Sequence, residues 1–123
     1  MHRPLHIPTR RRPVPPGEIL VREFLEPLGI TQAAFAQRVG MTPTRVSEIV
    51  HGKRAVTLDA AMRFGRALGT SPDMWLRMQL TLDMYDAIHG PAAAKIARIK
   101  PFDPRGGEGR DRRVRNGREP IPA

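Results

Sequence analysis

The sequence contains no cysteine and only one tryptophan and one tyrosine among its 123 residues. The absence of cysteine excludes a disulfide framework and every cysteine-ligated zinc site. No apolar run approaches the roughly 20 residues that a membrane-spanning helix needs. The arginines near the start are not followed by the apolar segment of a secretory signal. We therefore expect a soluble, cytoplasmic protein without membrane association, of a size that suits one domain with tails.

Recognisable enzyme motifs are also missing. The four histidines show no His-Glu-x-x-His spacing, and the sequence has neither a nucleophile elbow nor a dinucleotide-binding fingerprint. Asp83, Asp86 and His89 share one helical face, but without a further ligand such a trio is more often a solvated stripe than a metal site. We expect no catalytic residues, no metal and no other cofactor.

Positive charge is in excess, with a formal net charge of +9, and it is concentrated at the two ends. Residues 1–15 contain four arginines and no acidic residue, and residues 100–123 contain seven basic and four acidic residues. Basic tails commonly bind polyanions non-specifically, with dissociation constants of about 10⁻⁴ to 10⁻⁶ M. Charge of this kind also serves solubility alone, so it is compatible with nucleic-acid binding without requiring it.

Between the two ends, apolar residues recur at helical spacing and no strand-like alternation is present. Thr31, Thr42, Thr57 and Ser71 stand at positions that predict N-caps, and a glycine follows each helical run. Pro27 is expected to tighten or bend the end of its helix. The prediction is an all-α domain over residues 16–90, after a basic proline-rich arm (1–15, extended or disordered) and before a short helical extension and a disordered basic tail (91–123). Its five helical segments are expected at residues 16–29, 31–40, 42–52, 57–69 and 71–90.

The stretch "TQAAFAQRVGMTPTRVSEIVHG" has the spacing of a helix-turn-helix unit. Ala36 is small where two helices would cross, and Gly40 permits a left-handed turn. Val46 and Ile49 face back toward the core. An ordinary helical hairpin is the alternative interpretation of the same residues.

In a helix-turn-helix unit the second helix enters the major groove of DNA. Arg45 suits a bidentate pair with guanine or, alternatively, a phosphate contact. Glu48 either accepts a hydrogen bond from cytosine or pairs with an arginine on the surface. The residues expected to contact bases are Pro43, Thr44, Arg45, Ser47 and Glu48. Those expected to contact phosphates are Gln32, Arg38, His51, Lys53 and Arg54.

The last long helical segment carries two apolar strips, and a small domain has only one core to cover them. Both strips can be buried in one bundle, but we expect one of them to form a dimer interface. A dimer would place two recognition helices about 34 Å apart, one turn of DNA. The predicted dimer residues are Trp75, Met78, Leu82 and Tyr85. The second strip consists of Leu76, Leu80, Met84 and Ala87 or Ile88.

From Pro16 to Phe102 the sequence resembles the HigA-type antitoxins of the Cro/C1-type (XRE) helix-turn-helix group. The segments "PGEIL", "EFLEPLGITQ", "VSEIVHGKR" and "ALGTSPDMWL" occur together in that family. The resemblance implies a five-helix, lambda-repressor-like fold and a dimer that binds a palindromic operator and represses its own operon. It also implies a partner, a HigB-type toxin that cleaves messenger RNA.

The resemblance assigns roles to particular positions. Gln32 matches a phosphate-binding glutamine, and residues 75–85 match a subunit-pairing helix. The operator-reading positions are matched by Thr44, Arg45, Ser47 and Glu48. The long arm and the basic tail depart from the family pattern. A solitary transcriptional regulator of the same fold, without a toxin, is the nearest alternative, and a protein-binding module is a third.

Overall fold

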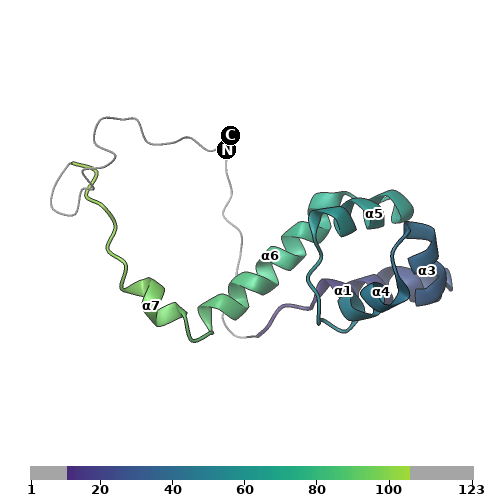
Figure 1. Cartoon of the computed structure of the whole chain (residues 1–123), viewed down its shortest axis with the longest axis horizontal. Helices are drawn as coiled ribbons and strands as arrows, with labels where there is room; N and C mark the ends of the chain where they lie inside the picture. The colour runs from purple at the N-terminus through teal and green to yellow at the C-terminus, as the bar shows by residue number, and fades with distance from the viewer. Residues whose placement is uncertain (1–10, 106–123) are drawn as a thin grey trace. The chain divides into compact units, whose positions relative to one another are not determined.

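The computed structural model describes residues 11–105, which contain helices and no β-strand. The first predicted segment comprises α1 (Pro16–Ile19), the π-helical turn η1 (Leu20–Leu25) and α2 (Glu26–Leu28), joined end to end. The other four are α3 (Gln32–Val39), α4 (Pro43–Val50), α5 (Leu58–Leu68) and α6 (Pro72–Ile88), as Figure 1 shows. The predicted all-α fold is confirmed. The predictions for residues 1–10 and 106–123 lie outside the described residues.

Three of the four predicted N-caps form. Thr31, Thr42 and Thr57 each accept a hydrogen bond from the amide three residues later, at 3.0, 3.1 and 3.2 Å. Each bond satisfies one of the amides that a helix start leaves free. The prediction is wrong for Ser71, whose hydroxyl turns to the carboxylate of Asp73 in place of an amide of α6.

The first helical segment widens before Pro27. The amide of Glu26 donates to the carbonyl of Val21, five residues back, which is the π-helical pattern. Proline has no amide hydrogen and its ring collides with the carbonyl four residues earlier. The chain therefore loosens the preceding turn, where we had predicted tightening or bending, and the segment ends at Gly29 with φ 65°.

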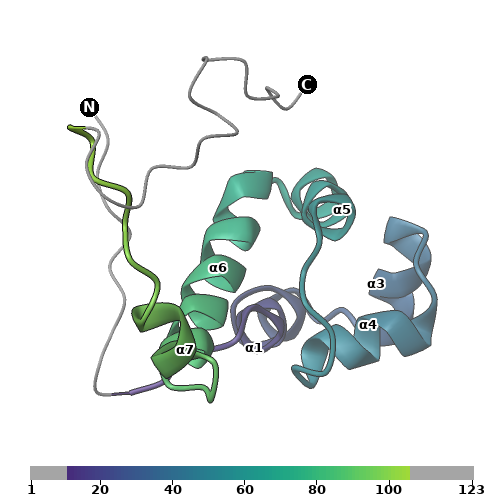
Figure 2. The ribbon, with the colours of Figure 1, turned by 60° about the vertical axis from the view of Figure 1, so that its left-hand side comes forward.

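Helices α1, α3, α4, α5 and α6 enclose one hydrophobic core. Aromatic rings join its halves: the ring centroids of Phe35 and Phe64 are 5.2 Å apart, and Phe64 meets Trp75 edge-on at 5.4 Å. The ring centroid of Phe24 lies 5.6 Å from that of Trp75. In Figure 2, α3 and α4 lie together at one side of this unit and α6 at the other.

Trp75 belongs to this core and Leu82 is also buried, so the prediction that they form a dimer interface is wrong. Trp75 is 0% exposed and its indole nitrogen donates to the hydroxyl of Thr70 at 2.8 Å, while Leu82 is 5% exposed. Side chains that are covered by their own chain have no surface to offer a second one. Met78 and Tyr85 are half-buried, so their role at an interface stays a prediction.

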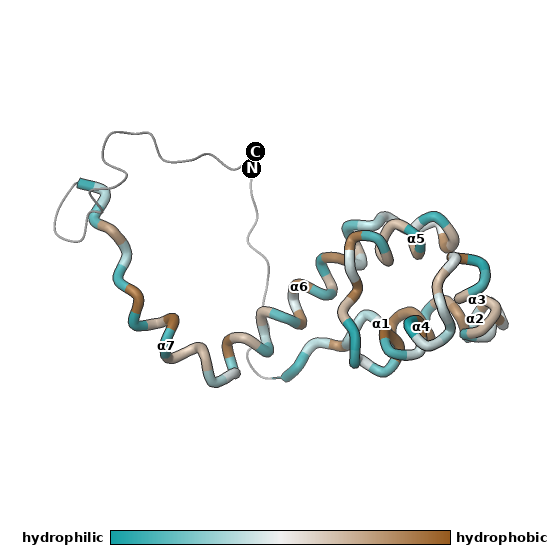
Figure 3. Tube along the Cα trace, in the orientation of Figure 1, coloured by the Kyte–Doolittle hydropathy of each residue, from teal (hydrophilic) through white to brown (hydrophobic). Residues whose placement is uncertain are grey.

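The second predicted strip of α6 is exposed except for Leu76, which is half-buried and packs against the core. Leu80 is 50% exposed, Met84 36% and Ile88 51%, although apolar residues run along the whole helix (Figure 3). These three residues, spaced four apart, are called the α6 strip below. All three stand between the middle of α6 and its C-terminal end. The C-terminal end of this helix extends beyond the other helices of this unit in Figure 1.

The described part of the N-terminal arm is attached to α6. The Arg12 guanidinium donates two hydrogen bonds, of 2.9 and 3.0 Å, to the carboxylate of Asp86. These bonds lower the pKa of the Asp86 carboxyl from its ordinary value. Nothing in the sequence pattern indicated this pair, whose members stand 74 residues apart.

A second compact unit begins at Gly90 and contains the short helix α7 (Ala93–Ala97). No residue of α7 is buried. None of the helices in residues 11–105 combines the length and the apolar character needed to cross a membrane.

Candidate nucleic-acid interface

Helices α3 and α4 are joined by a turn of fixed geometry. Gly40 adopts φ 71°, and the amide of Met41 donates to the carbonyl of Ala36 at 3.0 Å, which closes the C-terminal end of α3. Met41 is buried, and Thr42 then caps α4. Val46 and Ile49 are buried on the inner side of α4. The predicted inward-facing positions of the helix-turn-helix are therefore confirmed.

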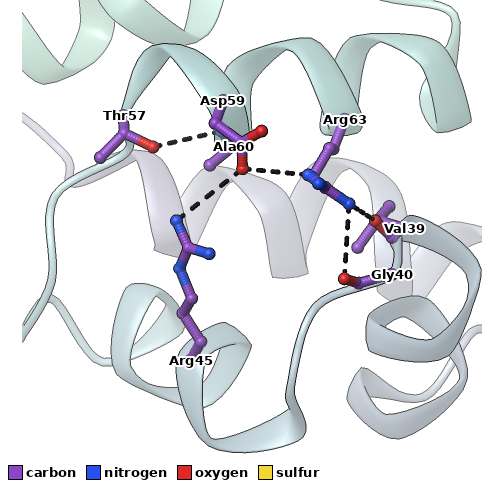
Figure 4. A network of polar contacts seen from close by, with 7 residues as sticks. All are labelled: Val39, Gly40, Arg45, Thr57, Asp59, Ala60 and Arg63. Atoms are coloured by element: carbon purple, nitrogen blue, oxygen red, sulfur yellow. Dashed lines mark hydrogen bonds and ion pairs between the residues drawn. The ribbon is translucent and has the colours of Figure 1, made fainter.

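Arg63 of α5 holds this turn in place. Its Nη1 donates to the carbonyls of Val39 and Gly40, at 2.8 and 3.4 Å, and its Nε donates to Asp59 at 2.9 Å (Figure 4). Carbonyls at a helix end lack partners within the helix, and a cation there interacts favourably with the helix dipole. The angle between α3 and α4 is thus supported by a third helix.

The outer side of α4 borders an open concavity of about 410 Å³. Its walls are polar, apart from the proline at the start of the helix, and they come from α4 and the turn that follows. Four of the predicted base-contacting residues and two of the predicted phosphate-contacting residues meet here. The residues are Pro43, Thr44, Ser47, Glu48, His51 and Lys53.

Two contacts order this surface in the unbound chain. The Nδ1 of His51 lies 2.8 Å from the carbonyl of Ser47 and 3.3 Å from its hydroxyl, so a protonated Nδ1 donates to the carbonyl. Arg54 donates from Nε to Glu48 at 2.8 Å. Glu48 therefore has the arginine partner that was one of its two predicted alternatives. This pairing neutralises the single acidic group among the residues that border the concavity.

Arg45 is directed differently from its neighbours on α4. Its side chain is 35% exposed and runs toward the first turn of α5, where Nη2 lies 3.9 Å from an Asp59 oxygen (Figure 4). Its Nε is buried and has no hydrogen-bond partner among residues 11–105. Arg45 thus turns away from the concavity toward α5, and its side chain makes no hydrogen bond among these residues.

The remaining predicted phosphate contacts are divided between two places. Gln32 is the first residue of α3 and is half-buried. Arg38 lies at the opposite end of α3, where it lines a separate groove between α3 and α5 together with Arg63 and Arg66. The structure therefore does not bring Arg38 together with Lys53 at the concavity.

Gly17 fixes how closely α1 approaches the end of α4. A Cβ atom at this position would lie 2.0 Å from the carbonyl oxygen of Ile49 and 2.7 Å from the Cα of Val50. Both neighbours are backbone atoms, so no side-chain rotation can make room. A glycine is required for α4 to occupy its observed position against α1.

The helix-turn-helix family model, described as "Helix-turn-helix", matches residues 21–75. Antitoxin HigA-1 of Vibrio cholerae is 42% identical over 78 residues, which cover 63% of this chain and 73% of that protein. The chain belongs to the HigA-type helix-turn-helix family.

Two further proteins are similar to this chain. The solved structure of Pseudomonas aeruginosa antitoxin HigA with the higBA promoter superposes with a TM-score of 0.68 at 33% identity, and the match covers 74% of this chain and 99% of that one. A helix-turn-helix transcriptional regulator of Haemophilus influenzae, itself uncharacterised, is 34% identical over 92 residues, or 74% of this chain and 86% of that protein.

Two features of this HigA-type chain could not be predicted from the sequence: the contact of Arg63 with the carbonyls at the end of α3, and the position of the Asp59–Arg63 pair beside Arg45. The contact of Arg63 with the α3 carbonyls crosses 24 residues and leaves no local pattern. Asp59 and Arg63 do stand four apart on α5, a spacing that signals an ion pair on a helix face. That spacing alone could not indicate that the pair also faces Arg45 and the turn.

Proposed function

We propose that this protein is a HigA-type antitoxin that binds operator DNA as a dimer, represses its own operon and neutralises a HigB-type, mRNA-cleaving toxin. The observation that carries the DNA-binding part is the division of α4 into a buried apolar side and an open polar side. The similarity to a HigA antitoxin solved with promoter DNA supports the same role. Because operator DNA lies in the bacterial cytoplasm, we propose that the protein is located there.

The open side of α4 has the chemistry needed to read a major groove. The methyl of Thr44 suits contact with thymine, and the hydroxyl of Ser47 suits several base edges. Lys53 follows the helix and is exposed, as a phosphate contact requires. Gln32 stands at the start of α3, where free amides favour an anion.

The Glu48–Arg54 pair has a role in this proposal. A carboxylate near DNA phosphates is repelled unless a cation or a hydrogen-bond donor offsets its charge. Arg54 provides that offset in the unbound chain. On DNA, Arg54 remains close enough to contact a phosphate while Glu48 accepts from the amino group of cytosine.

The dimer is proposed to form through the α6 strip. Leu80, Met84 and Ile88 are exposed large hydrophobic residues four apart on one helix. Because a contiguous apolar surface is costly in water, such a strip favours contact with a second copy. Half-buried Met78 and Tyr85 lie on the same helix and are proposed to border that contact.

Gel-shift titration with DNA from the protein's own promoter tests the DNA-binding part. We expect a shift that depends on a palindromic sequence and that weakens as salt is raised. A duplex with one half-site scrambled serves as the control. The absence of any shift at low salt would reject DNA binding.

Arg45→Ala tests the assignment of base contacts. If Arg45 pairs with guanine, the variant should lose about 1–3 kcal/mol of binding and relax the preference at one base pair. Binding to single-base-pair variants of the duplex measures both effects. Equal weakening on every duplex would assign Arg45 to a phosphate.

The toxin part is tested by co-expression with the adjacent reading frame. We expect that frame to encode a small cationic ribonuclease-like protein whose growth inhibition this chain relieves and with which it co-purifies. The second candidate is a solitary transcriptional regulator without a toxin; the similarity to a Haemophilus influenzae protein named as a transcriptional regulator supports the regulatory role alone. A DNA-binding chain with no such neighbour and no co-purifying toxin would establish that second candidate.

A further inference from the structure

We propose that Asp59, which lies outside the recognition helix, is a specificity-determining residue that positions Arg45 for base reading. This inference rests on the proposed DNA-binding function. It extends the reading surface to the first turn of α5, a segment to which the sequence had assigned only a helix-start role. Figure 4 draws the residues of this arrangement together, among them Arg45, Asp59, Arg63 and Gly40.

Asp59 is itself held in a fixed position. Its Oδ2 accepts from Arg63 Nε at 2.9 Å, and the same arginine is bound to the Val39 and Gly40 carbonyls. Asp59 also lies in the first turn of α5, where the helix dipole stabilises a negative charge. Through Arg63 the carboxylate is therefore linked to the turn between α3 and α4. This link fixes its position relative to the recognition helix α4.

Arg45 is oriented by this carboxylate without being bound to it. Its Nη2 lies 3.9 Å from Oδ2, which is within ion-pair range but longer than a hydrogen bond. Arg63 already occupies that oxygen at 2.9 Å. The charge of Asp59 thus orients the Arg45 guanidinium toward the start of α5. Asp59 nevertheless accepts no hydrogen bond from it.

The guanidinium nitrogens of Arg45, which make no hydrogen bond within the described part of the chain, indicate what its orientation by Asp59 is for. A buried nitrogen without a partner is costly, and Arg45 Nε is such a nitrogen within the described part of the chain. A guanine in the major groove offers two acceptors that match the two Nη groups of a guanidinium, so this pair does not require the buried Nε. Holding Arg45 in one direction beforehand reduces the entropy lost when that bidentate pair forms. Asp59 thereby favours the base pair that Arg45 recognises over the others.

The test compares Asp59→Asn with Asp73→Asn. Asp73 is a matched control because it also stands in the first turn of a helix and also pairs with an arginine four residues on, Arg77, at 3.4 Å. Both variants remove one negative charge, so both are expected to raise affinity for all DNA. Discrimination is measured by fluorescence anisotropy as the affinity ratio between the promoter duplex and its variant at the base pair that Arg45→Ala relaxes.

We expect Asp59→Asn to lower this ratio about two- to fivefold, the range of a partly exposed ion pair. Asp73→Asn should leave the ratio unchanged. In an Arg45→Ala background, Asp59→Asn should have no further effect on it. A purely structural role of Asp59 would instead lower affinity in both backgrounds alike, and circular dichroism confirms that the variants compared are folded.

Three results would overturn the inference while leaving DNA binding intact. One is an unchanged ratio in Asp59→Asn, the second is an equal fall in Asp73→Asn, and the third is an Arg45→Ala variant that relaxes no base pair. A wild-type protein that binds no duplex would instead reject the proposed function, and the inference with it.

Discussion

Gly17 offers a sharp test of how the recognition helix is held in place, through the substitution Gly17→Ala. The added Cβ would lie 2.0 Å from the Ile49 carbonyl oxygen, whereas ordinary contact begins at 3.4 Å. Helices α1 and α4 must therefore separate by more than an ångström. The atoms in the way belong to the backbone of α4, so the helix itself has to move.

The magnitude follows from two opposing effects. Overpacking a core costs about 1–3 kcal/mol, and a backbone obstacle favours the upper end of that range. Alanine's better helix propensity offsets up to about 1 kcal/mol. We expect a net loss of about 2 kcal/mol in the free energy of unfolding. For a domain of this size that loss lowers the melting temperature by about 8–16 °C.

Gly65→Ala is the matched control. Its Cβ would meet the Thr70 carbonyl oxygen at 2.6 Å, at the corner between α5 and α6 and away from α4. Urea unfolding and operator affinity are measured for both variants, with affinity corrected for the folded fraction. Both should lose stability, but only Gly17→Ala should lose affinity per folded molecule, because only it displaces α4. A Gly17→Ala protein with wild-type stability, or with undiminished corrected affinity, would refute this reasoning.

Further outcomes are expected for α6, for Lys53 and for the Arg12–Asp86 pair. Leu80→Asp should give a folded monomer and Trp75→Asp an unfolded chain, as judged by sedimentation and circular dichroism; a folded Leu80→Asp dimer would move the interface elsewhere. Lys53→Ala should weaken binding to all duplexes alike and reduce the salt slope by about one unit; an unchanged slope would remove Lys53 from the phosphate contacts. The Asp86 carboxyl should titrate below the ordinary aspartate value of about 3.9. Its bond to Arg12 therefore stabilises the fold above that pH and is lost as the pH falls through the lowered pKa. Carboxyl NMR measures the titration, and Arg12→Ala should bring the pKa back up; a pKa that is already ordinary in the unaltered protein contradicts the bond.

Local signals in the sequence were sufficient for the helices and for the helix-turn-helix. A threonine cap depends on an amide three residues away, and a glycine stop on its own backbone angle, so both can be read without knowing the fold. Thr42 and Gly40 illustrate this, since both act as predicted. Ser71 shows the limit: the side chain of Asp73, two residues later, competes for its hydroxyl.

Features that depend on which helices meet could not be predicted in this way. The two strips of α6 are almost equally apolar, and which one is buried depends on residues of other helices, such as Phe24 and Phe64 around Trp75. The direction of Arg45 likewise depends on Asp59, on a different helix. Periodicity identifies the faces of a helix but not the partner of each face.

Amide NMR spectra of the isotope-labelled protein, recorded during titration with its promoter duplex at low salt, show which surface meets DNA. We expect the largest shifts at Thr44, Ser47 and Lys53, which border the concavity of α4. The amides around Leu80 should change little. Shifts confined to α6, or no shifts at all, would contradict the proposal that α4 reads DNA.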